Sequence, residues 1–221
     1  MILVTIASAP DAVAAQVVRL PRRSQEPGLW ASAGVGYAQM SAVRDGRTNA
    51  EWGFGDGLQY RASLEYALGG GMGVGVVGSF ARLPMTYAQG TVPDGVGPLP
   101  APGSYDAHGD VRSLHAGFHA GGRLGFHQVI QVGVGVTSFA NFRRDDTDAP
   151  IGPSSDTDFS FSLGYGFGYT LGARMSIHVV QDLSSNIHQK AGLPNDARRM
   201  TTQYTTRAGL RIGVGQRRTR M

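Results

Sequence analysis

The segment FSFSLGYGFGYTL, residues 159–171, alternates strictly between two kinds of side chain. Its odd-numbered positions are Phe, Leu or Tyr, and its even-numbered positions are Ser, Gly or Thr. Successive side chains of an extended chain leave opposite faces, so this period of two predicts a β-strand. Because glycine normally weakens the interior of a strand, the bare face of this segment is the feature to explain.

The same alternation recurs along the chain, and no stretch between its repeats has a helical period. Eight segments carry it, at residues 29–43, 58–68, 72–87, 111–121, 128–142, 159–171, 175–184 and 201–214. Segment 58–68 is typical, with Leu64 on one face and Arg61 and Glu65 on the other. A few positions, such as Val77 and Val180, depart from the pattern. The sequence therefore predicts eight strands, each with one apolar face.

The connections between these segments alternate in length. Three are tight, at residues 69–71, 122–127 and 172–174, and four are long and polar, at residues 44–57, 88–110, 143–157 and 185–200. Tight connections join antiparallel neighbours, so the pattern predicts an up-and-down meander with its long loops at one end. Closing eight such strands into a barrel removes the sheet edges that otherwise promote aggregation.

The composition of the other face indicates which side of the barrel meets water. That face is mostly Gly, Ser, Thr and Gln, only 16% of the chain is charged, and Lys190 is its single lysine. A water-exposed surface normally carries many Lys and Glu side chains. An eight-stranded barrel is just wide enough inside for side chains to fill it, which suits this face. We therefore expect an all-β, eight-stranded, antiparallel, up-and-down transmembrane β-barrel, with a soluble lipocalin-like barrel as the alternative.

The length of the segments supports a membrane location. A strand of about 13 residues rises about 40 Å, and a tilt near 40° leaves roughly 30 Å, enough for the ~25 Å apolar band of an outer membrane. Aromatic residues lie near both ends of segment 159–171, as in the aromatic girdles of such barrels. The bare face then points into a narrow lumen, where its glycines leave room for arginine and histidine side chains of other strands.

On this pattern the chain resembles the small eight-stranded outer-membrane β-barrels of Gram-negative bacteria, the group that includes the membrane domain of outer-membrane protein A, outer-membrane protein X and the opacity proteins. The resemblance covers residues 29–214. It implies the bacterial outer membrane, with tight turns in the periplasm and long loops outside. The last segment also resembles the assembly signal of the barrel insertase, at Arg207, Gly209, Ile212 and Val214, although the chain continues to GQRRTRM instead of ending on an aromatic residue.

The termini complete the expected organisation. Residues 1–15 have a short apolar core and small residues at Val13 and Ala15, which suits cleavage before Gln16. Basic residues before the core are missing, so we predict a truncated signal peptide. Residues 16–28 form a periplasmic segment, 29–214 the barrel and 215–221 a tail. No run of about 18 apolar residues is present, which argues against a transmembrane helix.

Charged and histidine residues on the small-residue face are the candidate site. They are Arg61, Glu65, His115, His119, His178, Asp182, Arg207 and Arg211. Charges in a lipid-shielded interior are costly unless they are paired. We expect them to form a salt-bridged network that fills the lumen, and a narrow passive pore for small solutes or ions is the alternative.

A lipid-modifying enzyme is the second alternative. The segment QDLSSNIHQ resembles the His-any-Ser-Asn motif of the lipid A deacylase through Ser184, Ser185, Asn186 and His188. Asp182 stands where that motif has its histidine, and a serine needs an adjacent base to act as a nucleophile. We therefore expect the Ser-Ser-Asn run to open an external loop and the protein to be non-enzymatic.

No cofactor or metal is expected. His115 and His119 lie four residues apart, a spacing that brings two ligands together on a helix but leaves them about 13 Å apart on a strand. Asp145, Asp146 and Asp148 could hold calcium, but the glycine and the final glutamate of a dedicated calcium loop are missing, which favours a solvated charge cluster. Cysteine is absent, and no basic block indicates nucleic-acid binding.

The long loops carry the expected contacts with partners. Six arginines fall in them or at their edges: Arg44, Arg47, Arg143, Arg144, Arg198 and Arg199. Arginine forks bind phosphate in a bidentate manner, so we hypothesise that these residues contact lipopolysaccharide phosphates. The other expected partners are outer-membrane lipid, the barrel-assembly insertase during biogenesis and an extracellular ligand of the loops. We expect a monomer with a structural or surface-interaction role.

Overall fold

The computed structural model describes residues 26–44, 51–88, 104–151, 155–187 and 200–216. This part of the chain folds into strands, and it contains no helix long and apolar enough to cross a membrane. The strands are β1 (Leu29–Met40), β2 (Val43–Arg44), β3 (Glu51–Phe54), β4 (Gly57–Gly69), β5 (Met72–Ala88), β6 (Ser104–Ala120), β7 (Gly125–Arg144), β8 (Ser155–Leu171), β9 (Met175–Ile187) and β10 (Met200–Val214).

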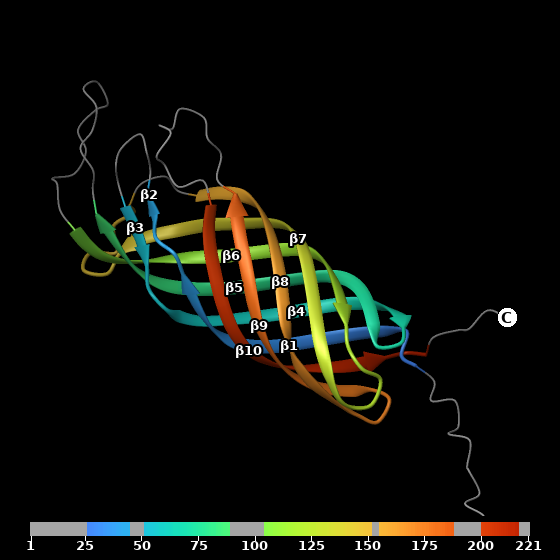
Figure 1. The fold of residues 1–221 in the computed structure, drawn as a ribbon. Helices are drawn as coiled ribbons and strands as arrows, with labels where there is room; N and C mark the ends of the chain where they lie inside the picture. Colours follow the sequence, from blue (N-terminus) through green and yellow to red (C-terminus); the bar gives the residue numbers. More distant parts are fainter. Residues whose placement is uncertain (1–25, 45–50, 89–103, 152–154, 188–199, 217–221) are drawn as a thin grey trace, which may run out of the picture.

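Eight of these strands form a closed antiparallel barrel, which confirms the predicted fold. β1 pairs with both β4 and β10, each strand from β4 to β10 pairs with the next, and the β5–β6 pairing closes the ring. The tight turns lie at one end, together with the first and last described residues, and the strand ends that the long connections join lie at the other end (Figure 1). β2 and β3 extend the sheet beside the outer part of β5 at the long-loop end.

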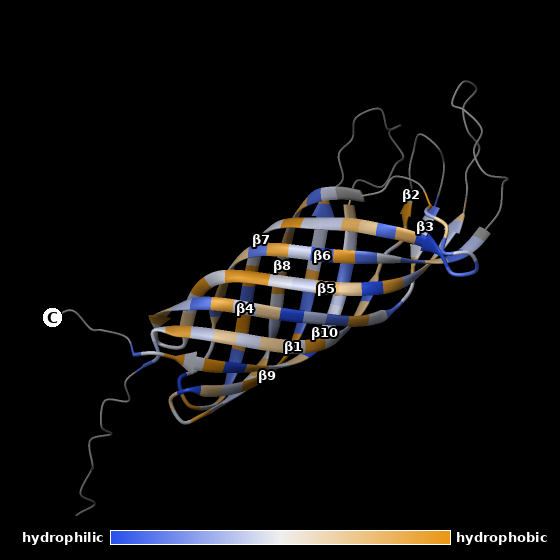
Figure 2. Cartoon of the chain, turned by 180° about the vertical axis from the view of Figure 1, so that it is seen from behind, coloured by the Kyte–Doolittle hydropathy of each residue, from blue (hydrophilic) through white to orange (hydrophobic). Residues whose placement is uncertain are grey.

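The predicted faces of the strands are also correct. Large apolar and aromatic side chains point outward and are exposed all around the barrel, in a band that we call the apolar belt, from Leu29, Leu64 and Val76 to Tyr165 and Ile212. Figure 2 shows the resulting alternation of hydrophobic and hydrophilic positions along each strand. An exposed apolar band that surrounds the whole barrel is the surface that transmembrane β-barrels present to lipid.

Several strands run further toward the long-loop end than the sequence predicted. β6 begins at Ser104 and not at residue 111, β8 begins at Ser155 and not at 159, and β3 lies inside the predicted loop 44–57. The pairing continues because β5 stays hydrogen-bonded to β6 as far as Ala88 and Ser104, past Pro84, while β3 pairs with the same part of β5. The proline and glycine residues of these stretches indicate a loop when only the sequence is considered. In the structure, backbone pairing with the neighbouring strands holds the same stretches in the sheet.

The glycines of β8 make room for three different neighbours. A Cβ at Gly168 would lie 2.8 Å from Nε2 of His127, which matches the expectation of a histidine. At Gly164 the neighbour is the Asp182 carboxylate, not an arginine. At Gly166 a Cβ would overlap the backbone carbonyl oxygen of Val179 on β9, so the strands approach too closely for any side chain. The bare face therefore makes room both for lumen side chains and for the close approach of the neighbouring strand β9.

We expect Gly166→Ala to impair folding of the barrel, because its methyl group must displace backbone atoms of β9 rather than a flexible side chain. The loss of stability is on the order of 1–3 kcal/mol, as for other overpacked interiors. Urea unfolding in detergent micelles, followed by the heat-modifiable gel shift, measures it. Gly78→Ala is the matched control, because Gly78 faces outward and a Cβ there meets only an atom at 3.7 Å. Equal stability of the two variants would contradict this role of Gly166.

Candidate functional site

The middle of the lumen is crossed by a polar network centred on Arg207. Arg207 donates through Nε to Asp182 on the neighbouring strand β9 and through Nη2 to Oε1 of Gln131 on β7. Its Nη1 also donates to Nε2 of His178 at 3.0 Å. Arg61 of β4 reaches the same two acceptors, Asp182 Oδ2 at 3.5 Å and Gln131 Oε1 at 3.3 Å. Side chains from four strands therefore meet across the interior.

A second ion pair lies closer to the tight-turn end. Arg211 of β10 donates through Nη2 and Nε to Oε2 of Glu65 on β4, at 2.7 and 3.1 Å. Ser63 donates to the other carboxylate oxygen of Glu65 at 2.7 Å. The Arg211 guanidinium also lies over the ring of Trp30, 4.3 Å from its centroid. The pair is thus fixed by a hydroxyl and by an aromatic face.

The burial of these charges makes the pairing essential. Glu65, Asp182, Arg207 and Arg211 are each at most 5% exposed. Separating such a charge from its partner in a lipid-shielded interior costs several kcal/mol. The structure brings all eight residues of the predicted lumen network to the inner face: Arg61, Glu65, His115, His119, His178, Asp182, Arg207 and Arg211. His119 joins the network through Gln131, whose Nε2 lies 3.0 Å from His119 Nδ1.

A Ser–His contact lies above the network, toward the long-loop end. His115 Nε2 is 2.7 Å from Ser160 Oγ, and Thr137 Oγ1 donates to the same oxygen at 3.0 Å. Ser160 is fully buried, and the other ring nitrogen of His115 faces Ser162 Oγ at 3.4 Å instead of a carboxylate. A serine nucleophile needs an oriented base and access for a substrate. This geometry provides hydrogen bonds that fix β6 against β8.

The sequence-predicted hydrolase residues lie elsewhere. Ser184, Ser185 and Asn186 belong to β9, so the expectation that this run opens an external loop is wrong. Ser185 and Asn186 are buried, because β9 continues to pair with β8 and β10 to its end at Ile187. His188 is outside the described residues.

Apolar residues of β1, β5, β6 and β7, together with Ile151, pack on one another inside the barrel at the long-loop end, in a cluster that we call the apolar cap. Its members are Ala38, Met40, Ala81, Leu83, Met85, Ala107, Val111, Phe139, Phe142 and Ile151. Trp52 of β3 packs on them, with its ring 4.8 Å from that of Phe142 and 4.6 Å from that of Tyr87. Leu83 has no exposed surface. The cap therefore adds an apolar layer on the long-loop side of the polar network, along β1, β5, β6 and β7.

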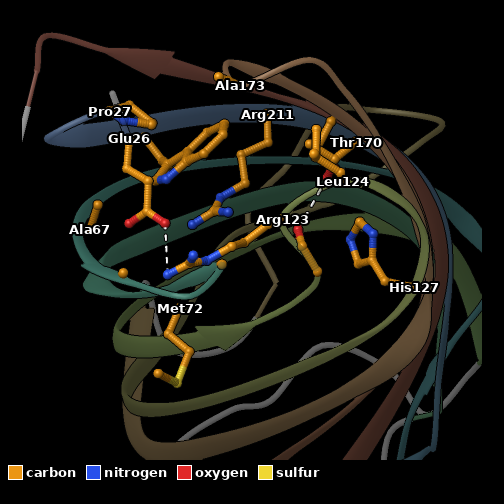
Figure 3. A pocket seen from close by; sticks show the side chains of 15 residues that line it. Glu26, Pro27, Ala67, Met72, Arg123, Leu124, His127, Thr170, Ala173 and Arg211 are labelled. Atoms are coloured by element: carbon orange, nitrogen blue, oxygen red, sulfur yellow. Dashed lines mark hydrogen bonds and ion pairs between the residues drawn. The ribbon is translucent and has the colours of Figure 1, made fainter. Parts of the chain in front are cut away.

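The tight-turn end of the lumen is open as a vestibule. A cavity of about 250 Å³ lies there, lined by residues that include Trp30, His127 and Arg211 (Figure 3). Two of its lining residues form an ion pair, Arg123 Nη2 to Glu26 Oε1 at 2.9 Å (Figure 3). Arg211 of the Glu65–Arg211 pair lines this vestibule, whereas none of the residues that line it belongs to the apolar cap.

Three of the six loop arginines, Arg44, Arg143 and Arg144, lie in the described part of the chain, at its long-loop end. Arg143 contacts Asp148 and Arg144 contacts Asp146 within the hairpin that follows β7, at 2.9 and 2.5 Å. The hydrogen bond from Arg144 lowers the pKa of Asp146 below its ordinary value. The predicted acidic cluster is therefore paired with arginines and with His108, which contacts Asp145 at 2.7 Å. Arg44 lies in β2, whereas Arg47, Arg198 and Arg199 fall outside the described residues.

Metal ligands were not expected from the sequence. Within the described residues, no group of three or more His, Cys, Asp or Glu side chains could hold a metal ion. Of the predicted assembly-signal residues, Arg207 and Gly209 face the lumen and Ile212 and Val214 face outward.

The sequence did not single out Gln131 or the apolar cap. Gln131 accepts from both Arg61 and Arg207, and its only signal was a large polar residue on a face otherwise rich in glycine. The cap residues face inward. The alternation of segment 72–87 could have indicated this, because Leu83 and Met85 occupy the same face as Gly73 and Gly75.

Comparisons with known proteins agree with this architecture. The sequence model of the outer membrane protein beta-barrel domain family matches residues 1–211. Neisserial surface protein A is 12% identical, with a TM-score of 0.50, over 84% of this chain and 97% of that chain. OprG from Pseudomonas aeruginosa is 14% identical, with a TM-score of 0.47, over 87% of this chain and 98% of that chain. At these identities the likeness to solved structures concerns the fold alone. A search of the curated proteins finds no match to the chain.

Proposed function

The chain belongs to the outer membrane protein beta-barrel domain family and lies in the bacterial outer membrane, and from this premise we propose that it is a non-enzymatic, non-conducting barrel with a surface-interaction role. Proteins of this architecture have short periplasmic turns and longer extracellular loops. The long-loop end, with β3 and the extended parts of β5, β6 and β7, then projects outside the cell.

The observation that carries the proposal is the filled lumen. The Arg207 network joins four strands across the middle of the barrel, and the apolar cap packs on its long-loop side. An ion crossing this interior would have to separate buried ion pairs and then pass an apolar layer, and both steps are costly. A barrel closed in this way anchors its external end rigidly, which favours a role in surface contacts over transport.

We expect no steady ion conductance when the purified protein is inserted into planar lipid bilayers. The reason is that an ion would have to displace the buried Arg207 network and then pass the apolar side chains of the cap, and both steps are costly. Single-channel recording in potassium chloride measures the conductance, with insertion verified by the heat-modifiable gel shift. Large and reproducible open channels would refute the closed barrel and favour the narrow pore instead.

A further inference from the structure

Two arginines face outward directly beyond the apolar belt on the long-loop side. Arg82 follows Phe80 at the next outward position of β5, and Arg112 precedes Leu114 at the next outward position of β6. Phe80 and Leu114 belong to the belt and are 36% and 57% exposed. The two guanidinium groups therefore lie where acyl chains give way to headgroups.

A buried carboxylate holds these arginines together. Arg82 donates through Nε to Asp110 Oδ1 at 2.8 Å, and Arg112 donates through Nη2 to Asp110 Oδ2 at 3.0 Å. Asn141 of β7 donates to the same Oδ2 at 2.7 Å. A register shift in β6 between His108 and Asp110, and a positive φ of 54° at Asn141, accompany this arrangement.

The cluster keeps its cations accessible while covering its anion. The side chains of Arg82 and Arg112 are 58% and 55% exposed, whereas that of Asp110 is 1% exposed. Two guanidinium groups against one carboxylate leave one net positive charge at a fixed position. Arg112 also lies 5.8 Å from the centroid of the Phe80 ring, which adds to its orientation. Asp110, which accepts from both Nε and Nη2 of Arg82, thus holds the two guanidinium groups in place before any ligand binds, which lowers the entropic cost of binding.

We propose that Arg82 and Arg112 bind a phosphate group of lipopolysaccharide in the outer leaflet. Guanidinium forks match phosphate oxygens in a bidentate manner, and the site faces the lipid at headgroup level. This proposal moves the lipid contact away from Arg143 and Arg144, because each of these has a carboxylate of its own, whereas Arg82 and Arg112 share one. It rests on the proposed orientation, with the long loops outside the cell.

The test uses the refolded full chain in dodecyl maltoside micelles, with hexa-acylated bisphosphoryl lipid A as the probe. Native mass spectrometry measures the retained lipid. We expect the wild type to retain lipid A and Arg82→Gln/Arg112→Gln to retain it about tenfold more weakly, since charge-assisted hydrogen bonds to phosphate are lost. Arg143→Gln is the matched control, because Arg143 is also an exposed arginine at the same end. Equal retention by the double variant and the wild type overturns the proposal.

Two further measurements keep the test decisive. The double variant leaves the Asp110 carboxylate with few partners, which could destabilise the barrel by itself. The triple variant Arg82→Gln/Arg112→Gln/Asp110→Asn removes this unpaired charge and should show the same loss of lipid A. Lipid A stripped of both phosphates should bind the wild type as weakly as the variants do. If the stripped lipid is retained as well as the phosphorylated one, the site recognises acyl chains and the proposal is wrong.

The orientation is checked separately on intact cells. The chain has no cysteine, so Thr147→Cys in the hairpin after β7 and Arg123→Cys at the tight turn are single labelling sites. We expect a bulky maleimide to label Thr147→Cys only. Labelling of Arg123→Cys instead overturns the orientation and the outer-leaflet site together. If Thr147→Cys is labelled but the arginine variants retain lipid A as well as the wild type does, the orientation stands and only the lipid site is wrong.

Discussion

Replacing Asp182 by alanine lowers the free energy of unfolding of the barrel by about 3–5 kcal/mol, the typical cost of breaking a buried ion pair by removing one partner. Asp182 contacts both Arg61 and Arg207, and its own side chain is 4% exposed. Without it, two guanidinium groups remain in a lipid-shielded interior with only neutral acceptors such as Gln131. Urea unfolding in detergent micelles, followed by tryptophan fluorescence, measures the change.

Two comparison variants separate the charge effect from other causes. Glu26→Gln also removes a carboxylate from an ion pair, but its partner Arg123 is 66% exposed, so a loss of about 0–1 kcal/mol is expected. The triple variant Asp182→Asn/Arg61→Gln/Arg207→Gln removes the unpaired charges and should regain most of the stability lost in Asp182→Ala. If the triple variant is less stable than the single one, uncompensated charge is not the cause.

Replacing Phe142 by alanine also destabilises the barrel, by about 3–5 kcal/mol, because it opens a cavity in the apolar cap. Phe142 is 8% exposed and its ring lies 4.8 Å from that of Trp52. The emission of Trp52 should shift to longer wavelength as water enters the cap, and a Trp30→Phe background isolates this signal from the second tryptophan. Urea unfolding of the same samples gives the free energy.

Phe142→Leu is the control for this prediction, since it keeps most of the apolar volume and should lose roughly 1 kcal/mol. The expected order of stability is wild type, then leucine, then alanine. An alanine variant as stable as the leucine variant would show that the cap does not depend on close packing at Phe142.

The barrel itself was predictable because each strand is in contact with two different surroundings. Outward positions such as Leu64, Phe161 and Ile177 meet lipid, whereas Arg61 and Glu65 face the lumen. Since side chains of a strand alternate with a period of two, this difference is written directly into the sequence. The tight turns at glycine-rich positions supplied the antiparallel order. Local composition also showed which positions of each of the eight strands face outward.

The extent of the strands at the long-loop end was not predictable in the same way. Ser104 and Glu51 are in strands because β5 offers them free backbone hydrogen-bonding groups, not because of their own preferences. The same holds for Ser185 and Asn186, whose polar character indicated a loop, although β8 and β10 hold them in the sheet. Pairing of this kind depends on neighbours that are distant in sequence.

The charged residues of the lumen show the same division. Their inward direction was determined by the alternation, and so was the need for pairing. Which charges meet depends on the register between strands: Arg207 reaches Asp182 on β9, while Arg211, one inward position beyond Gly209, reaches Glu65 on β4. A displacement of one strand by two residues would preserve every face and exchange these partners.

The sequence by itself determined that this protein is a membrane barrel, because lipid outside and a narrow lumen inside impose a period of two on every strand. Only the tertiary structure decided what fills and surrounds that barrel. The register brings Gln131 between Arg61 and Arg207, the extended strands assemble the apolar cap, and the shift at Asp110 gathers two arginines at the edge of the apolar belt. Each of these depends on contacts between distant segments, which local alternation does not specify.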